Sequence, residues 1–197
     1  MRGCRARGWP LGEAGAIEYK GTMTENLRYP IGPEPPLPAD SKRARDGNIA
    51  VIEALPDRLG EAVHALTDAQ LDTAYRPGGW TVRQVVHHLA DSHLNGFMRV
   101  KLALTEDTPA IKPYDEAAWA RLADSRLAIA PSLSILEGLH ARWAALYRSL
   151  DEGDFARTFY HPERNEQLSL ERHLHIYAWH SRHHVAHITA LRERQGW

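Results

Sequence analysis

The end of the sequence, from Ser169 to just before Gly196, has the residue spacing of one long helix, and this helix carries six histidines. With successive residues placed 100° apart, four of them fall in a stripe roughly 60° wide: His173, His180, His184 and His187. Apolar residues flank the stripe. A helix with such a face has to pack its imidazoles against other helices, so this feature predicts a bundle with a site between helices.

Three earlier segments have the same helical periodicity. Apolar residues recur at spacings of three and four in residues 40–66, 81–104 and 132–150. Thr81 and Gln84 have the spacing of a capping box, which places the start of a helix at Thr81. Pro56 is expected to kink or split the first of these helices. Four long helices with polar links predict an all-α four-helix bundle with a metal site between its helices.

The segments outside these helices have distinct compositions. Residues 1–22 are rich in glycine and arginine and lack apolar periodicity, so we expect a disordered extension or a misassigned start, followed by one domain over 23–197. Residues 29–38 hold five prolines and are expected to run extended over the surface. Residues 159–168 have the pattern of a small hairpin or an irregular loop.

Charge and cysteine content exclude several classes of protein. The 24 basic and 25 acidic residues give a net charge of −1, which provides no basic surface for a nucleic acid. There is no apolar run of about 18 residues, so we expect no membrane-spanning helix and no membrane partner. The one cysteine, Cys4, excludes an intrachain disulfide and a cysteine-based zinc site, and it fits a cytoplasmic location.

Histidines spaced i, i+4 on one helix face can bind a metal ion together. The last helix offers two such pairs, His180 with His184 and, as the rival, His183 with His187. The segment from His180 to His184 lacks the glutamate of an HExxH motif, so a zincin-type protease is not expected. Because two ligands hold a divalent ion poorly, a third ligand is expected from another helix.

Residues 87–93 are the natural source of that third ligand. His88 falls on a polar stripe beside the apolar face, as expected for the wall of a wet cavity, whereas His87 falls opposite the core. The alternative to a metal site is a row of interior histidines bonded to carbonyls and water. Structural roles are expected for the remaining histidines, with His93 and His173 in the core and His64, His140 and His175 at the surface or in packing.

Two histidine-rich blocks, residues 78–93 and 177–188, together with shorter segments such as Tyr29–Gly32 and Phe159–Pro162, resemble the YfiT-type metal-dependent hydrolases of the DinB-like superfamily. The resemblance extends over about residues 26–197. It implies a four-helix bundle that is typically a homodimer, with one zinc or nickel ion per subunit held by three histidines. These histidines correspond to His88, His180 and His184. His187 stands where the family usually has glutamine, which makes it a candidate fourth ligand.

Three functions are compatible with such a site. The first is a hydrolase that uses a metal-bound water on a small-molecule substrate, with Asp91, His161 and His187 as candidate general bases. The second is a thiol S-transferase that conjugates a low-molecular-weight thiol to electrophiles, with Arg99 as a candidate to bind the thiol's carboxylates. The third is a non-catalytic metal-binding protein with a filled coordination sphere. The resemblance favours the hydrolase.

Overall fold

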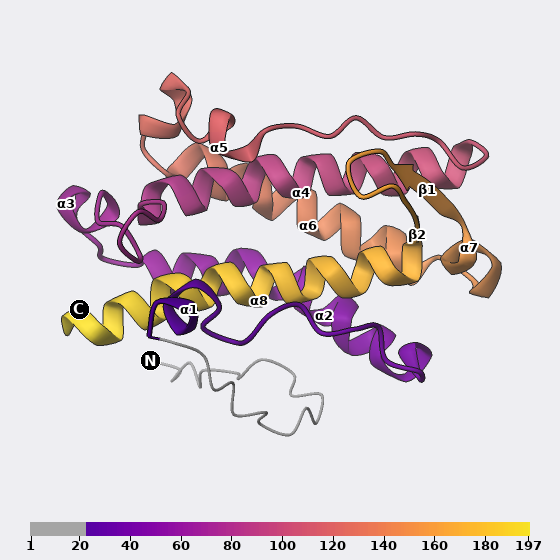
Figure 1. Ribbon diagram of the computed structural model, residues 1–197, viewed down its shortest axis with the longest axis horizontal. Helices are drawn as coiled ribbons and strands as arrows, with labels where there is room; N and C mark the ends of the chain where they lie inside the picture. The colour runs from indigo at the N-terminus through magenta and orange to yellow at the C-terminus, as the bar shows by residue number, and fades with distance from the viewer. Residues whose placement is uncertain (1–22) are drawn as a thin grey trace, which may run out of the picture.

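The computed structural model describes residues 23–197, and four long helices form its framework (Figure 1). They are α2 (Ser41–Val63), α4 (Val82–Thr105), α6 (Ala130–Arg148) and α8 (Leu170–Gln195). The all-α four-helix bundle predicted from the sequence is therefore confirmed. The predicted boundary after residue 22 depends on a segment outside the described residues. In residues 23–197 no helix is both long and apolar enough to cross a membrane.

Each long helix packs against two others, and the order around the bundle is α2, α8, α4, α6. Long helices that follow one another can therefore lie diagonally opposite, as α2 and α4 do, and as α6 and α8 do. The connection from α2 to α4 contains α3 (Asp68–Leu71), and the connection from α6 to α8 contains α7 (Glu152–Ala156) and a hairpin. This order places α4 directly beside α8, so the two histidine-rich segments lie on adjacent helices.

The remaining short elements cover the edges of the bundle. They are α1 (Met23–Arg28), α5 (Glu116–Trp119) and a 3-10 helix (Ala123–Arg126). The hairpin joins β1 (Thr158–His161) to β2 (Glu166–Ser169), with Thr158 opposite Ser169. Of the two alternatives expected for this region, a small hairpin or an irregular loop, the structure has the hairpin, and β1 packs against α4.

Polar caps fix where the two site-bearing helices begin. The side chain of Thr81 accepts a hydrogen bond from the Gln84 backbone N–H, and the Gln84 side chain accepts one from the Thr81 N–H. The predicted capping box is therefore confirmed. Ser169 caps α8 by accepting from the Arg172 N–H, and Gly196 ends it with φ of 71°, a conformation that suits glycine. These caps set the register of the histidines on both helices.

Pro56 does not split α2, which runs unbroken from Ser41 to Val63, so that part of the expectation is wrong. A proline inside a helix has no N–H to donate to the carbonyl four residues earlier, which here belongs to Ile52. Nδ1 of His140, on α6, is hydrogen-bonded to this carbonyl instead. The helix continues because its neighbour replaces the missing donor.

The core consists of two apolar clusters with a layer of histidines between them. One cluster includes Ile52, Trp143 and Leu174, and the other includes Leu55, Leu89 and Ile188. Along α8 the change from one cluster to the other falls at His180 and His184, along α4 close to His88 and His93, and along α6 next to His140. Each of these three helices therefore contributes imidazole to the same level of the bundle.

Gly96 allows a close approach of rings to α4 just beyond this layer. A Cβ atom at Gly96 would lie 2.5 Å from Cζ of Tyr177 and 2.8 Å from a ring carbon of Trp143. The absence of a side chain thus lets both aromatic rings pack directly on the α4 backbone. The Tyr177 hydroxyl donates to the Ser92 carbonyl at 3.1 Å, which fixes α8 against α4 beside the histidines.

Candidate metal centre

Helix α8 presents His180 and His184 one turn apart on the side that faces α4. Their ring centroids are 4.4 Å apart. His184 is buried and His180 is partly buried. The i, i+4 spacing of the sequence thus becomes a pair of adjacent imidazoles at the centre of the bundle.

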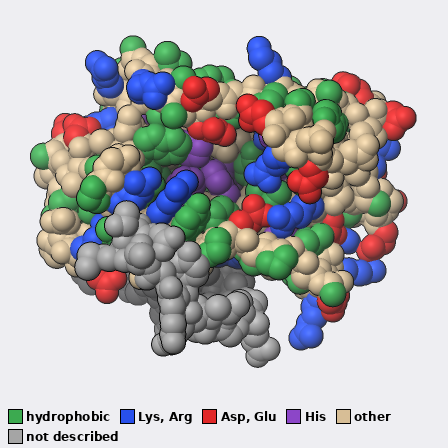
Figure 2. Space-filling view, viewed as in Figure 1, with side chains coloured by type: hydrophobic (Ala, Val, Ile, Leu, Met, Phe, Trp, Pro, Cys, Tyr) green, Lys and Arg blue, Asp and Glu red, His purple; other side chains and the backbone are tan. Residues whose placement is uncertain are grey.

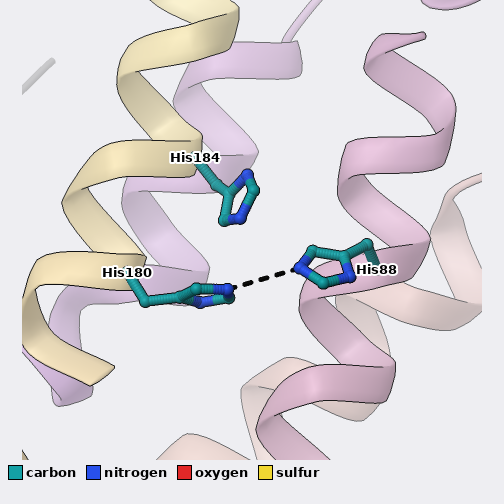
Figure 3. A group of neighbouring side chains, drawn as sticks. All are labelled: His88, His180 and His184. Carbon is teal, nitrogen blue, oxygen red and sulfur yellow. Dashed lines mark hydrogen bonds between the residues drawn. The ribbon is translucent and has the colours of Figure 1, made fainter. Parts of the chain in front are cut away.

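His88 reaches the same point from α4. Its Nε2 lies 3.3 Å from Nε2 of His180, and its ring centroid lies 4.9 Å from that of His184. Trp80 packs against the His88 ring at a centroid distance of 4.5 Å. Figure 3 shows the three rings pointing toward one another across the space between α8 and α4. One ring nitrogen of each lies within 4.8 Å of the others, and we call His88, His180 and His184 the histidine cluster.

Burial keeps the rings of the histidine cluster uncharged. It lowers the pKa of His88 to about 4, with a smaller contribution from the charge of His187. Burial also lowers the pKa of His180 and His184 well below the usual range, and the neighbouring imidazoles oppose protonation further. Neutral imidazole offers the nitrogen lone pair that binds a metal ion.

The donor set fits a divalent transition metal. Imidazole nitrogen suits zinc and nickel, and three protein ligands leave one position open in a tetrahedral site, as in catalytic zinc centres. Within residues 23–197, no other group of three or more His, Cys, Asp or Glu side chains brings its potential ligand atoms this close together. The structure therefore brings together His88, His180 and His184, the three residues that the family resemblance implies as ligands.

A cavity of about 230 Å³ adjoins the histidine cluster. Figure 2 shows histidine side chains at the bottom of a hollow on this face, with basic side chains close by. The residues that line the cavity include His88, His180, Arg99, Tyr114, His161 and Tyr177. A larger hollow of about 530 Å³ between α2 and the end of α8 contains no member of the cluster, whereas the smaller cavity is lined by two of them.

Of the three candidate general bases, His161 lines this cavity and the other two do not. Burial lowers the pKa of His161, and the charges of Arg99 and Arg164 lower it further, so its ring is neutral near pH 7. Asp91 is partly buried on α4 outside the cavity lining, and burial raises its pKa. Nε2 of His187 lies 2.9 Å from the Arg28 carbonyl, so this side chain is engaged elsewhere.

The rival pair, His183 and His187, faces the N-terminal strap, by which we mean residues 28–38. The strap runs along α8 in Figure 1, without regular secondary structure beyond Arg28. The ring centroid of His183 lies 5.8 Å from that of Tyr29. His187 also stacks on Tyr75 at 3.9 Å. The two histidines are buried, but neither belongs to the group whose ring nitrogens converge.

His93 and His140 lie next to the histidine cluster, and their positions differ from the roles expected for them. His93 is fully buried, but it is more than a core residue, because its Nε2 lies 3.0 Å from Nδ1 of His180. His140 is also fully buried, and its Nε2 lies 2.9 Å from Nδ1 of His93. The helical angles of His93 place it within the core face of α4, and this is the one sequence signal that it faces another helix.

Comparison with known proteins agrees with this architecture. A family model described as the DinB superfamily matches residues 52–188. YfiT of Bacillus subtilis, which is named as a metal-dependent hydrolase, is 56% identical over 173 residues, covering 87% of this chain and 97% of the relative. A Bacillus mycoides protein named for the same activity is 51% identical over 173 residues, covering 88% of this chain and 99% of the relative.

A solved structure extends the comparison to three dimensions. It is that of YfiT from Bacillus subtilis, described as a probable metal-dependent hydrolase with an unusual four-helix bundle topology. The two folds agree with a TM-score of 0.84 at 56% sequence identity, over 87% of this chain and 99% of that chain.

Proposed function

The chain belongs to the DinB superfamily, and we propose that it is a metal-dependent hydrolase that acts on a small-molecule substrate at the histidine cluster. The observation that carries this proposal is the convergence of three neutral imidazoles, from two helices, beside a cavity that can admit a substrate. His88, His180 and His184 would hold one metal ion per chain.

The residues around the cluster have separate parts in this proposal. A divalent ion held by these three neutral ligands would keep its full charge and would supply Lewis acidity toward a substrate carbonyl or water. The neutral His161 ring, on the wall of the same cavity, would accept the proton that water gives up. Arg99 and Arg164, also in the wall, would orient a substrate that carries negative charge.

Zinc is the metal we propose, with nickel as the alternative, because imidazole nitrogen suits both ions. We also propose a homodimer, for which exposed apolar side chains on the adjacent helices α4 and α6, among them Met98 and Ile135, offer a surface. A cytoplasmic location is part of the proposal, since a chain with one cysteine has no intrachain disulfide to require an oxidising compartment.

The deciding experiment measures product release by the zinc-loaded protein from a panel of esters and amides, in the absence of thiol. We expect turnover that is lost on chelation and restored by zinc. A parallel series adds bacillithiol, mycothiol or glutathione with a generic electrophile. Metal-dependent conjugation without any thiol-independent hydrolysis would overturn the proposal in favour of thiol transfer. Inactivity in both series, with a four-coordinate site that excludes solvent, would leave a structural metal.

A further inference from the structure

A row of three histidines runs from the histidine cluster to the opposite side of the bundle. Nδ1 of His180 lies 3.0 Å from Nε2 of His93. Nδ1 of His93 lies 2.9 Å from Nε2 of His140. Nδ1 of His140 is hydrogen-bonded to the backbone carbonyl of Ile52. The row therefore connects α8, α4, α6 and α2 in succession.

The last contact determines the position of every proton in the row. A carbonyl oxygen only accepts, so Nδ1 of His140 must carry the proton that it donates to Ile52. A neutral imidazole carries one proton, which leaves Nε2 of His140 as an acceptor for the N–H on Nδ1 of His93. By the same rule Nε2 of His93 accepts from Nδ1 of His180. The proton of His180 then lies on Nδ1, and its Nε2 carries a lone pair that faces Nε2 of His88 at 3.3 Å.

Each ring does carry a single proton near pH 7. Burial lowers the pKa of His140 to about 4. His93 has no exposed surface and both of its ring nitrogens contact only other imidazoles, so a charge on its ring would be buried without a counter-charge. His93 is fully enclosed by neighbouring rings, among them Trp143 and Tyr177. No ring of the row is therefore charged at neutral pH, and the accounting of donors and acceptors holds throughout.

The row ends at a carbonyl that α2 leaves free. An ordinary residue at position 56 would donate its N–H to the Ile52 carbonyl, but Pro56 has none. The proline that interrupts the helical pattern of α2 thus provides the acceptor at the end of the row. Because a peptide carbonyl does not take up a proton in this pH range, the row fixes protons in place and does not conduct them.

From this arrangement we propose that His93 and His140 are positioning residues that hold His180 as its Nδ1–H tautomer, so that Nε2 of His180 always presents its lone pair to the metal. This inference rests on the proposed metal site and adds the residues that prepare it. His184 has no such support, since its Nδ1 is buried without a hydrogen-bond partner among the described residues. His180 is therefore pre-oriented in a way that His184 is not. Partners of this kind on a ligand histidine fix its tautomer and ring orientation.

The first test reads the tautomers directly by nitrogen NMR of the imidazoles in the purified full-length protein. We expect the proton on Nδ1 in His180, His93 and His140. A proton on Nε2 of His180 or His93, or a mixture of tautomers, would overturn the proposal. His93 and His140 are not among the proposed ligands, so their tautomers do not depend on metal binding or turnover and separate failure of the row from failure of the proposed function.

The second test measures zinc affinity in variants of His140. His140→Phe fills the space but removes the acceptor for His93, and we expect zinc affinity to fall by about 10- to 100-fold, the usual cost of removing such a partner. His140→Gln can both donate to Ile52 and accept from His93, so we expect it to restore most of the affinity. If His140→Phe fails to fold, the test uses His140→Gln alone. In that variant we expect His93 to keep its proton on Nδ1, and a mixture of His93 tautomers would contradict the proposal.

His87→Phe is the matched control. His87 is also a buried histidine of α4, with contacts of 2.7 Å to the Ser132 hydroxyl and 3.2 Å to the Leu127 carbonyl, but it lies outside the row. We expect this variant to lose stability and keep its zinc affinity. Equal losses of affinity in His87→Phe and His140→Phe would reduce the role of His140 to general packing.

Discussion

Two pairs of histidines on α8 have the same spacing and opposite environments. His180 and His184 face α4, where a third imidazole and a cavity complete a site. His183 and His187 face the N-terminal strap, and His187 is hydrogen-bonded there to a backbone carbonyl. The same i, i+4 spacing therefore forms a candidate metal centre on one side of the helix. On the other side it binds the N-terminal strap.

The difference lies in what each neighbour offers. The α4 side supplies nitrogen atoms with lone pairs, which cannot satisfy one another fully and so suit a shared cation. The strap side supplies the carbonyls of Arg28 and Pro35, which accept from His187 and His175 respectively. His187 and His175 thus use Nε2 in a hydrogen bond to a carbonyl, and although their Nδ1 atoms are buried without a hydrogen-bond partner among the described residues, no further ligand atoms converge on them. Helical spacing alone therefore does not make a metal site.

The largest expected effect separates the two pairs by metal content. His180→Ala or His184→Ala should abolish stoichiometric zinc binding, because each removes one of three ligands. His183→Ala and His187→Ala, which alter the same helix at the same spacing, should keep one ion per chain. Metal analysis of the purified proteins measures both. Zinc retained in His180→Ala but lost in His183→Ala would show that the site belongs to the rival pair, His183 and His187.

The choice of His88 is tested in the same way. His88→Ala should lose the ion, whereas His87→Ala should keep it, since His87 is bonded to Ser132 and Leu127 on the other side of α4. The opposite result would show that α4 presents its other histidine to the site.

A second effect concerns acid stability. Burial lowers the pKa of His140 to about 4 and that of His173 to about 3, below the value near 6.5 of an unfolded chain. The unfolded state thus takes up protons first as the pH falls. The stability from these neutral rings is complete above about pH 6.5 and is lost as the pH falls toward 4 and 3, by up to about 1.4 kcal/mol per pH unit for each ring.

Urea unfolding at pH 7.5 and at pH 5 measures this loss. His140→Phe has no imidazole to protonate at that position. In this variant the difference in the free energy of unfolding between the two pH values should become smaller. An unchanged difference would mean that His140 does not contribute to the acid sensitivity.

A smaller effect is expected on the strap side. His187→Ala removes the hydrogen bond to the Arg28 carbonyl and the stacking on Tyr75, so the free energy of unfolding should fall by about 1–3 kcal/mol while zinc remains bound. Thermal unfolding of the zinc-loaded protein gives the measurement. The idea of a structural role for this pair fails if His187→Ala unfolds like the unaltered protein.

The smallest effect concerns the far end of the strap. Glu34 forms an ion pair with Arg172, and both side chains are partly exposed. Glu34→Gln should therefore lower stability by less than about 1 kcal/mol and leave zinc affinity unchanged. A drop in zinc affinity in this variant would show that the strap influences the site through α8.

Much of the fold followed from local patterns. Residues 81–104 correspond closely to α4 because the capping box of Thr81 and Gln84 defines its start. The break expected at Pro56 does not occur, because the effect of that proline depends on His140, a residue 84 positions further along the chain. A donor from a distant helix is invisible in the sequence near a proline.

The candidate site divides in the same way. Helical angles identified both histidine pairs on α8 and placed His88 at a cavity wall, and family resemblance selected His180 and His184 between the pairs. His93 was expected in the core and was not expected to touch His180, and His140 was not expected to touch His93. Such contacts depend on which helices are adjacent, and α4 and α6 face each other at positions 47 residues apart.

By itself, the sequence determined the four long helices, the capping box of α4 and the helix face on which the histidines of α4 and α8 lie, because these follow from the 3.6-residue turn and from hydrogen bonds within a few residues. The tertiary structure alone decided which face meets which neighbour. The order α2, α8, α4, α6 places His88 opposite His180 and turns His183 and His187 toward the strap. The packing of distant segments sets that order, so residues with equal spacing on one helix acquire different chemistry.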